Sequence, residues 1–239
     1  MRRRKSNFAR NVRILLLVGL VVLMARYSLA VVKDGVTYSF PTVSFAQTLI
    51  PPDPAMSEEV LLLLVNKDNR LPEGYRADLT VVEGAKVDRI MSQGLTEMKR
   101  AAERDGVQLY ITSAYRTKGE QKQIFNDTVS GYVKQGNSKK AAQERATEVA
   151  ALPGYSEHET GLAVDFSFGG DWEKQERMWD WLSQNAHHHG FILRYPPGKE
   201  NITGYNHEPW HYRYVGVEHA KVVYERGVVL EEYLGGMDN

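Results

Sequence analysis

The sequence contains no cysteine among its 239 residues. That absence excludes disulfide bonds, thiolate nucleophiles and zinc sites built from cysteine. The chain also has no excess of charge, because 30 basic residues balance 30 acidic ones. Proteins that bind nucleic acid usually carry a positive excess, so we expect no nucleic acid partner. With 42% hydrophobic residues, the chain can form one well-packed domain, or one domain with an appendage.

The charge is balanced overall but unevenly distributed along the chain. The first 13 residues hold no acid and six cations, namely Arg2, Arg3, Arg4, Lys5, Arg10 and Arg13. An apolar run, Ile14–Ala25, follows directly, and apolar residues resume at Leu29–Val32 after Arg26. A basic start followed by about a dozen apolar residues is typical of a secretory signal.

Two interpretations of this N-terminal segment stay open. A cleaved signal needs a small-residue cleavage site, and Ser44–Ala46 resembles one but lies far from the apolar run. An uncleaved anchor would be a helix over Ile14–Val32, which is 19 residues long and close to the length that spans a membrane. We favour the anchor. Both interpretations place the rest of the chain outside the cytoplasm, because positive charge stays inside.

We therefore divide the chain into three parts. Residues 1–32 form a signal or membrane-anchor segment, residues 33–57 an extracytoplasmic linker rich in proline, and residues 58–239 one globular domain. Apolar periodicity predicts helices at Lys86–Asp105, Lys118–Lys134, Ser138–Ala150, Trp172–His188 and Val217–Arg226. Strands are predicted at Val60–Val65, Val107–Thr112, Leu162–Phe168, Phe191–Arg194 and Trp210–Val215. Strands dispersed among helices without strict alternation indicate an α+β fold with a largely antiparallel sheet.

Two short motifs carry the chemistry. The first runs from Ser156 to Asp165 and contains His158, and the second is Glu208-Pro-Trp-His211. Together they offer two imidazoles and one carboxylate as metal ligands, with one carboxylate to spare. A catalytic zinc site uses three protein ligands and keeps the fourth position for water. The spare carboxylate, Glu208, fits the base that takes a proton from that water.

Each of these residues also has an ordinary explanation when it is taken alone. Asp165 lies between apolar neighbours in a predicted strand, where a hydrogen-bonded or ion-paired aspartate is common. His158 fits a satisfied histidine, and Glu208 a surface glutamate. Arg116, at a strand-to-helix junction, fits a helix cap or a clamp for a carboxylate or developing oxyanion. Only the combination of residues favours the metal site.

The motifs resemble the zinc D-alanyl-D-alanine carboxypeptidases, and most closely the VanY-like and L,D-carboxypeptidase branch. The resemblance covers roughly Leu61 to Val217 and shows no departure at the zinc or base positions. Its blocks are Ser156-x-His158-x-x-Gly161-x-Ala163-x-Asp165, Glu208-x-x-His211, Ser113-Ala-Tyr-Arg116, Leu64-Val-Asn-Lys67 and Gly190-Phe-Ile-Leu-Arg-Tyr-Pro196. It implies a small domain whose central antiparallel sheet carries the metal.

The resemblance also assigns roles to particular residues. It implies one zinc ion held by His158, Asp165 and His211, with Glu208 as catalytic acid and base and Arg116 as a clamp on substrate or transition state. We expect further contacts to substrate from a group of pocket residues, Ser156, Gln121, Ser113, Tyr205 and Trp210. The implied substrate is a peptidoglycan stem peptide or its lipid-linked precursor, from which the terminal D-alanine of a D-Ala-D-Ala bond is removed.

Two alternatives stay open. The same zinc machinery could act as an L,D-carboxypeptidase on tetrapeptide stems, since a few pocket side chains decide between the two bonds. A wall-binding module that retains zinc only for structure is the non-enzymatic alternative. The presence of Glu208 argues against a structural module, because a structural zinc site needs no base and usually has a protein ligand in its fourth position.

Overall fold

The computed structural model describes residues 31–33, 36–38 and 54–236. The chain separates into two units, Met1–Pro54 and Ala55–Asn239. The predicted anchor falls almost entirely on residues 1–30, which lie outside the described residues. Within the described ranges, no helix has the length and apolar character needed to cross a membrane.

The first unit contains a two-stranded antiparallel hairpin. Strands β1 (Val31–Lys33) and β2 (Val36–Tyr38) pair with Val32 opposite Thr37. β-branched residues on both sides of an Asp-Gly dipeptide, here Asp34-Gly35, are a strong hairpin signal in sequence. The anchor helix considered over Ile14–Val32 therefore does not include Val31 and Val32, which lie in β1, and its other residues lie outside the described ones.

The second unit is built around a four-stranded antiparallel sheet. Its strands follow the order β5 (Ile111–Ser113), β6 (Ala163–Phe166), β8 (His211–Tyr214) and β7 (Phe191–Leu193). Three of these strands match predicted ones with shorter ends. The fourth, β5, occupies only the C-terminal part of the predicted Val107–Thr112 strand and extends one residue beyond it. The predicted α+β class with an antiparallel central sheet is confirmed.

A small second sheet precedes the first long helix and was missed by the sequence analysis. Strands β3 (Leu79–Val82) and β4 (Ala85–Asp88) form a hairpin with a tight turn at Glu83 and Gly84. Both turn residues have positive φ, 47° and 86°, as two-residue hairpin turns with right-handed strand twist require. The predicted helix therefore begins only at Arg89, where Asp88 accepts a hydrogen bond from the backbone N–H of Ile90.

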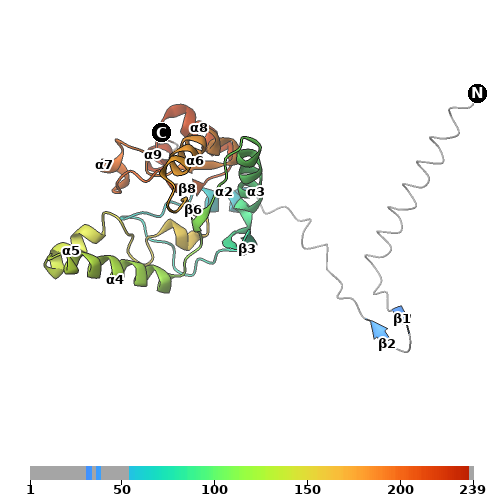
Figure 1. The fold of residues 1–239 in the computed structure, drawn as a ribbon, viewed down its shortest axis with the longest axis horizontal. Coiled ribbons are helices and arrows are strands. Elements are labelled where there is room, and N and C mark those ends of the chain that lie inside the picture. The colour runs from blue at the N-terminus through green and yellow to red at the C-terminus, as the bar shows by residue number, and fades with distance from the viewer. Residues whose placement is uncertain (1–30, 34–35, 39–53, 237–239) are drawn as a thin grey trace, which may run out of the picture. The chain divides into compact units, whose positions relative to one another are not determined.

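Helices surround the sheet in the order that Figure 1 shows. The described helices are α2 (Pro54–Leu61), α3 (Arg89–Arg104), α4 (Lys118–Lys134), α5 (Lys139–Ala146), η2 (Glu157–Thr160), α6 (Trp172–Asn185), η3 (Ala186–His189), α7 (Glu200–Thr203), α8 (Val217–Arg226) and α9 (Leu230–Gly235). Helices α4 and α8 have the predicted bounds. The predicted Trp172–His188 helix tightens into 3-10 geometry after Asn185.

The predicted strand over Val60–Val65 is wrong. Helix α2 ends at Leu61, and the residues after it pair with no strand. The backbone here bonds a side chain instead of a strand, since the Arg213 guanidinium donates hydrogen bonds to the carbonyls of Leu61 and Leu63. A short apolar run cannot by itself distinguish a strand from other buried backbone.

The main core lies between α3 and one face of the sheet. The face of α3 that carries Met91, Leu95 and Met98 is fully buried against Leu162 and Phe166. Burial of each such side chain contributes about 1.5–3 kcal/mol. This packing holds β6 in place, and β6 carries one of the predicted metal ligands.

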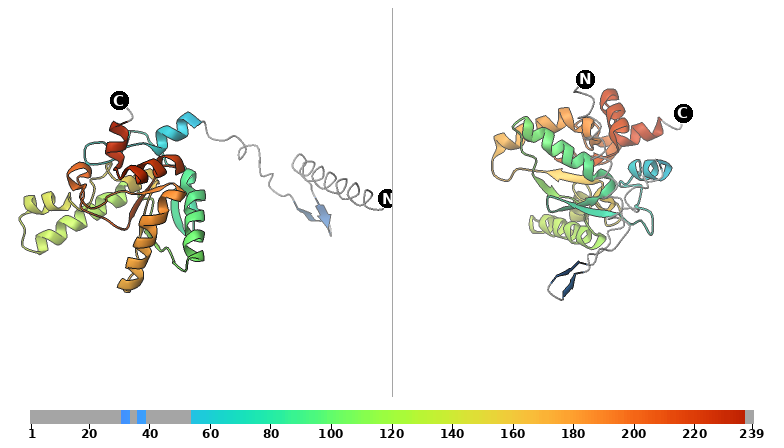
Figure 2. Two further views of the ribbon diagram at one scale, coloured as in Figure 1. Left: turned by 90° about the horizontal axis from the view of Figure 1, so that it is seen from above. Right: turned by 90° about the vertical axis from the view of Figure 1, so that its right-hand side faces the viewer.

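Helices α4 and α5 form a pair that packs on a small apolar cluster of its own, Phe125, Ala146 and Ala150. Figures 1 and 2 show this pair extending from the sheet in a different direction from α6. The α4–α5 pair and the start of β8 therefore offer two separate walls for a site at the sheet.

Candidate metal centre and cavity

Three elements of the second unit bring the predicted metal ligands together. His158 comes from η2, Asp165 from β6 and His211 from β8. Asp165 and His211 are direct partners across the β6–β8 ladder, so their side chains share one face of the sheet. Within the described part of the chain, this trio is the only group of three metal-type residues with ligand atoms within 4.8 Å of one another.

Gly161 positions His158 by ending η2 and turning the chain into β6. Its φ of 78° lies in the left-handed region that favours glycine. A Cβ atom at this position would lie 3.0 Å from the backbone nitrogen of Asp88 and 3.2 Å from its Cβ. Both the turn and the close approach of the β4 backbone therefore require glycine here.

The hydrogen bonds of the two imidazoles determine which nitrogen of each ring faces Asp165. Nδ1 of His158 donates to the carbonyl of Ala114 at 2.8 Å, so Nε2 faces Oδ2 of Asp165 at 3.2 Å. His211 turns Nδ1 toward Oδ1 of Asp165 at 2.8 Å. Its Nε2 lies 3.4 Å from Oε2 of Glu157. One nitrogen of each ring thus converges on the same carboxylate.

This donor set fits a divalent metal ion. Nδ1 of His158 carries the proton of the hydrogen bond to the Ala114 carbonyl. In the neutral ring, Nε2 therefore has no proton, and its lone pair faces the lone pairs of Asp165. That contact is unfavourable unless a cation lies between the two groups. Without a metal ion, protons on the facing nitrogens of His158 and His211 would take the place of the cation, and these imidazoles then hold the pKa of Asp165 below its usual value although burial works against its ionisation. Two imidazole nitrogens and a carboxylate oxygen are ligands that zinc, a borderline metal ion, commonly takes in proteins.

Glu157 was missed by the sequence analysis, although it is central to the site. Its carboxylate is buried and bonds Nε of Arg194 at 2.7 Å and Nη1 of Arg213 at 3.1 Å. Burial opposes its ionisation, but the two guanidinium groups lower its pKa below the usual value. Its second oxygen accepts from His211, so a carboxylate fixes the ring from the side away from Asp165.

The arginines behind Glu157 could have been noticed from strand alternation. Arg213 lies two residues after His211 in β8 and therefore points to the same side of the strand. Arg194, which follows β7, also binds Glu231 of α9 at 2.6 Å, and Asn66 donates to the same carboxylate. Segments from both ends of the domain thus support the metal face.

A cavity of about 180 Å³ opens beside the three ligands. Of the predicted residues, Glu208, Arg116, Ser156, Gln121, Tyr205 and Trp210 line it together with His158, Asp165 and His211. Ser113 does not line it. Ser113 is the register partner of Asp165 in the β5–β6 ladder, but it lines a different hollow near Lys86.

Glu208 and Arg116 approach the metal face from different elements. Glu208 lies just before β8, and its backbone N–H donates to the carbonyl of Tyr195 at 3.0 Å. Burial raises the pKa of Glu208, because the ionised carboxylate loses water. Burial likewise lowers the pKa of Arg116, partly offset by the nearby Asp165 and Glu208. Outside the ligand trio, the cavity lining therefore holds one guanidinium, Arg116, and two carboxylates, Glu208 and the arginine-paired Glu157.

Several polar atoms of the cavity wall are buried without a partner in the described structure. They include Nε of Arg116, Oε1 of Gln121 and the hydroxyl of Tyr205. The other end of the Gln121 amide is fixed, because its nitrogen donates to the carbonyl of Ala151 at 2.7 Å. Buried polar groups in proteins are nearly always hydrogen-bonded, so unpaired groups lining one cavity indicate that a polar ligand completes them.

Tyr195, also missed from sequence, stacks on the ring of His211 with centroids 5.0 Å apart and planes 24° from parallel. Tyr205 packs on Tyr195 in turn. These contacts restrict the His211 ring to the plane in which Nδ1 faces Asp165.

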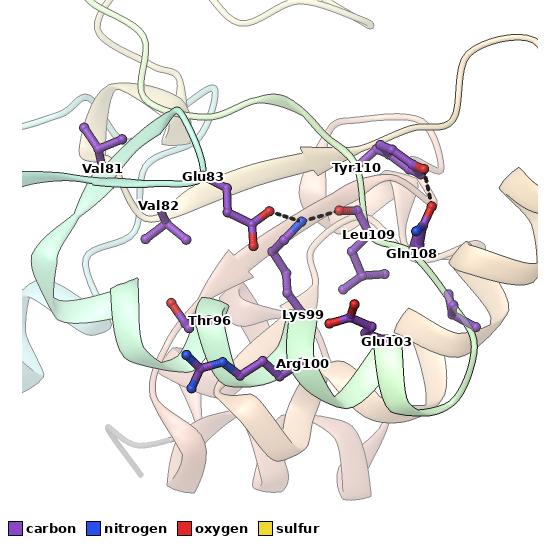
Figure 3. Close-up of a pocket in the computed structure, with 11 residues that line it drawn as sticks. Val81, Val82, Glu83, Thr96, Lys99, Arg100, Glu103, Gln108, Leu109 and Tyr110 are labelled. Atoms are coloured by element: carbon purple, nitrogen blue, oxygen red, sulfur yellow. Dashed lines mark hydrogen bonds and ion pairs between the residues drawn. The ribbon is translucent and has the colours of Figure 1, made fainter.

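A separate hollow of about 570 Å³ lies between the β3–β4 hairpin and α3 (Figure 3). The ammonium group of Lys99 in this hollow already has protein partners, because it donates to the Leu109 carbonyl and pairs with Glu83 at 3.0 Å. None of the metal or base candidates lines it. We therefore assign the chemistry to the smaller cavity at the sheet.

Comparison with known proteins agrees with this site. The family model described as VanY, D-alanyl-D-alanine carboxypeptidase, matches residues 84–217. The D-alanyl-D-alanine carboxypeptidase of Enterococcus faecalis is 41% identical over 178 residues, which are 74% of this chain and 66% of that protein. The chain thus spans just under two thirds of that relative's length.

Solved structures of similar proteins share the fold. A mutant of the vancomycin resistance D,D-pentapeptidase VanY from a VanB-type cassette, in complex with Zn(II), is 41% identical with a TM-score of 0.70. That match covers 74% of this chain and 99% of that one. The LD-carboxypeptidase LdcB is 31% identical with a TM-score of 0.64, over 89% and 95% of the two chains. The chain belongs to the VanY family of D-alanyl-D-alanine carboxypeptidases.

Proposed function

We propose that this protein is a zinc-dependent carboxypeptidase that removes the terminal D-alanine from peptidoglycan stem peptides or their precursors. One observation carries the proposal. The His158, Asp165 and His211 ligand atoms converge within 4.8 Å, while a further carboxylate, Glu208, lines the same cavity outside that trio. Family membership and the D-alanyl-D-alanine carboxypeptidase name of the Enterococcus faecalis relative support the substrate class.

Zinc would be held by Nε2 of His158, Nδ1 of His211 and the Asp165 carboxylate. When bound at such a site, zinc lowers the pKa of a water ligand to about 7 and polarises a carbonyl oxygen. Asp165 and the two rings are already oriented by the protein, since Ala114, Glu157 and Tyr195 fix the imidazoles.

Glu208 performs the proton transfers. As a carboxylate it takes a proton from the attacking water, and it then gives this proton to the amine of the departing D-alanine. A group that must both accept and donate works best when its pKa approaches the working pH, and burial moves the pKa of Glu208 upward.

Arg116 supplies the positive charge in the cavity. A substrate that ends in a free carboxylate can complete the unpaired Nε of this buried guanidinium, which favours exopeptidase over endopeptidase action. The unpaired oxygen of Gln121 and the hydroxyl of Tyr205 remain available for the terminal peptide unit.

The experiment that tests the proposal replaces Glu208 by alanine. We expect release of D-alanine to fall by at least a hundredfold while bound zinc stays near one ion per chain, because Glu208 is not a ligand. Glu200→Gln is the matched control, since Glu200 is an exposed glutamate outside the cavity, and it should behave like wild type. Normal turnover in a zinc-loaded Glu208→Ala protein would eliminate the assigned mechanism.

The likeness to LdcB supports a second candidate, L,D cleavage of a tetrapeptide stem. The same ligands, base and clamp serve both reactions. Mass detection of D-alanine released from a pentapeptide and a tetrapeptide, assayed side by side with and without chelator, decides between them. We expect the pentapeptide to be the better substrate. Binding to cell walls without chelator-sensitive release from either peptide would support a non-enzymatic wall-binding module.

The site of action follows from the N-terminal sequence. The basic and apolar residues before Lys33 support a membrane-held domain on the outer side, where stem peptides and lipid-linked precursors are found. Fractionation of cells that express the full chain tests this, because protease added outside intact cells should degrade the domain. Protection from that protease would refute the location.

A further inference from the structure

Three tryptophans form a continuous row that begins in the cavity wall. Trp210 lines the cavity, and its ring centroid lies 5.9 Å from that of Trp179 on α6. Trp179 in turn contacts Trp172 edge-to-face, with the centroids again 5.9 Å apart. Trp179 is fixed by a hydrogen bond from its indole N–H to the carbonyl of Phe166. We call these residues the tryptophan row.

The outer end of the row faces solvent. The Trp172 residue is 64% exposed, the largest exposure of any large apolar residue in the described ranges. Its position is nonetheless defined, because it opens α6 directly after the N-cap Asp171, which accepts from the backbone N–H of Lys174. An exposed tryptophan at the end of an aromatic row that starts in a polar cavity indicates a contact surface for a ligand.

The chemistry of the row indicates what it binds. Within the described residues, neither Trp172 nor Trp210 donates its indole N–H to a protein acceptor. The row therefore offers flat apolar faces together with free donors. A pyranose ring matches both, since it presents a face of C–H groups and a rim of hydroxyl acceptors.

We propose that the tryptophan row binds a sugar ring of the glycan to which the stem peptide is attached. This inference rests on the proposed function, because it takes the substrate to be a stem peptide carried by an amino sugar. It goes further by assigning a preference for glycan-linked stems over free peptides.

The length of the row agrees with this assignment. Two steps of 5.9 Å place the Trp172 ring no more than about 12 Å from that of Trp210. Four stem residues separate the sugar from a terminal D-Ala-D-Ala bond, and an extended chain of four residues spans at most about 14 Å. The row is therefore about as long as the stem, so a sugar ring can lie on its exposed end while the peptide enters the cavity that Trp210 lines.

The placement of the lining residues indicates in which direction the bound stem peptide runs. Gln121 and Ile124 line it from α4, next to Arg116, whereas Trp210 lines it from the start of β8 and is backed by α6. α4 and α6 leave the sheet in different directions (Figure 2). A terminal carboxylate held by Arg116 leaves the remainder of the stem to run toward Trp210.

The test compares wild type, Trp172→Ala and Trp172→Phe on two substrates, a free pentapeptide and the same pentapeptide linked to a disaccharide of N-acetylglucosamine and N-acetylmuramic acid. We expect wild type to have a lower KM for the glycopeptide. Trp172→Ala should raise that KM about tenfold with unchanged kcat and unchanged kinetics on the free peptide, and Trp172→Phe should restore most of the difference. Tyr224→Ala, an exposed aromatic on α8, is the control and should change neither.

Direct binding separates this proposal from the proposed function. Titration of the peptide-free disaccharide, followed by tryptophan fluorescence, should give saturable binding to wild type that Trp172→Ala abolishes, whether or not peptides are hydrolysed. Equal effects of Trp172→Ala on both substrates would show that the row contacts peptide and would overturn the proposal. Absence of disaccharide binding, or a Trp172-dependent affinity for lipid vesicles alone, would overturn it as well.

Discussion

The strongest perturbation of this site should come from Glu157, which is itself neither ligand nor base. Its carboxylate lies between Nε of Arg194 at 2.7 Å and Nη1 of Arg213 at 3.1 Å, and it accepts from His211. Both arginines are fully buried and Glu157 is 2% exposed. Replacing Glu157 by alanine leaves two guanidinium groups in the interior without their shared anion.

These contacts allow an estimate of how much folding stability the Glu157→Ala variant loses. Removing one partner of a buried ion pair typically costs about 3–5 kcal/mol, because the remaining charge is uncompensated. A domain of this kind is stable by only about 5–15 kcal/mol in total. Arg194 keeps Glu231 as a second partner and Arg213 keeps the carbonyls of Leu61 and Leu63, so we expect about 3 kcal/mol rather than the upper limit.

Zinc affinity should fall independently of stability. Loss of the carboxylate frees Nε2 of His211, and mutation of such supporting groups typically weakens metal binding 10- to 100-fold. Urea unfolding in the presence of chelator measures the stability term, and competition with a chromophoric chelator under native conditions measures zinc affinity. Glu157→Gln keeps the shape of the side chain and should fold better than Glu157→Ala while still binding zinc more weakly than wild type.

Glu144→Gln provides the control, because Glu144 pairs with Lys140 at 4.0 Å on an exposed helix face and should change stability by less than about 1 kcal/mol. If Glu157→Ala unfolds within 1 kcal/mol of wild type and binds zinc equally well, the carboxylate neither compensates the arginines nor orients His211, and the reasoning fails.

Three further outcomes follow from the same structure. Arg116→Ala should lower kcat/KM about 10- to 100-fold on peptides with a free C-terminal carboxylate, but only slightly on the same peptides with an amidated C-terminus. An equal loss of kcat/KM on both would exclude a carboxylate clamp. Gly94→Ala should destabilise the domain by about 1–3 kcal/mol in urea, because a Cβ there lies 2.6 Å from the His189 carbonyl oxygen, whereas Gly131→Ala in α4 meets nothing within 4 Å and should stabilise it by up to about 1 kcal/mol. Free zinc at about 1,000 times its Kd should add about 4 kcal/mol, so chelation should lower the Tm by roughly 8–16 °C, and an unchanged Tm would show that zinc does not bind the folded trio.

The residues of the site were more predictable than the backbone around them. His158, Asp165, His211 and Glu208 stand in two compact motifs whose donor types already indicate a metal site. Glu157 stands inside the first motif but has no signal of its own, since a glutamate in a polar segment is usually solvated. Its role depends on Arg194, which is distant in sequence, and no local pattern records that pairing.

Secondary structure shows the same division. Helix α4 carries a capping box at Thr117 and Glu120, and α8 begins and ends next to glycine, so their bounds could be predicted locally. The Val60–Val65 run failed as a strand because its first two residues belong to helix α2 and the rest pair with no strand. The hairpin at Glu83–Gly84 was not predicted because glutamate seldom takes a positive φ.

The amino-acid sequence by itself determined the chemical inventory: imidazole nitrogens and carboxylate oxygens without thiols, a spare carboxylate, and a strand pattern that favours an antiparallel sheet. The tertiary structure alone decided how these groups are used. Strand register sets Asp165 opposite His211, and burial decides which charges must be paired. The contacts of Trp179 decide that the cavity wall continues outward to an exposed Trp172. Such features depend on distances between segments remote in the chain, and those distances arise only when the chain packs.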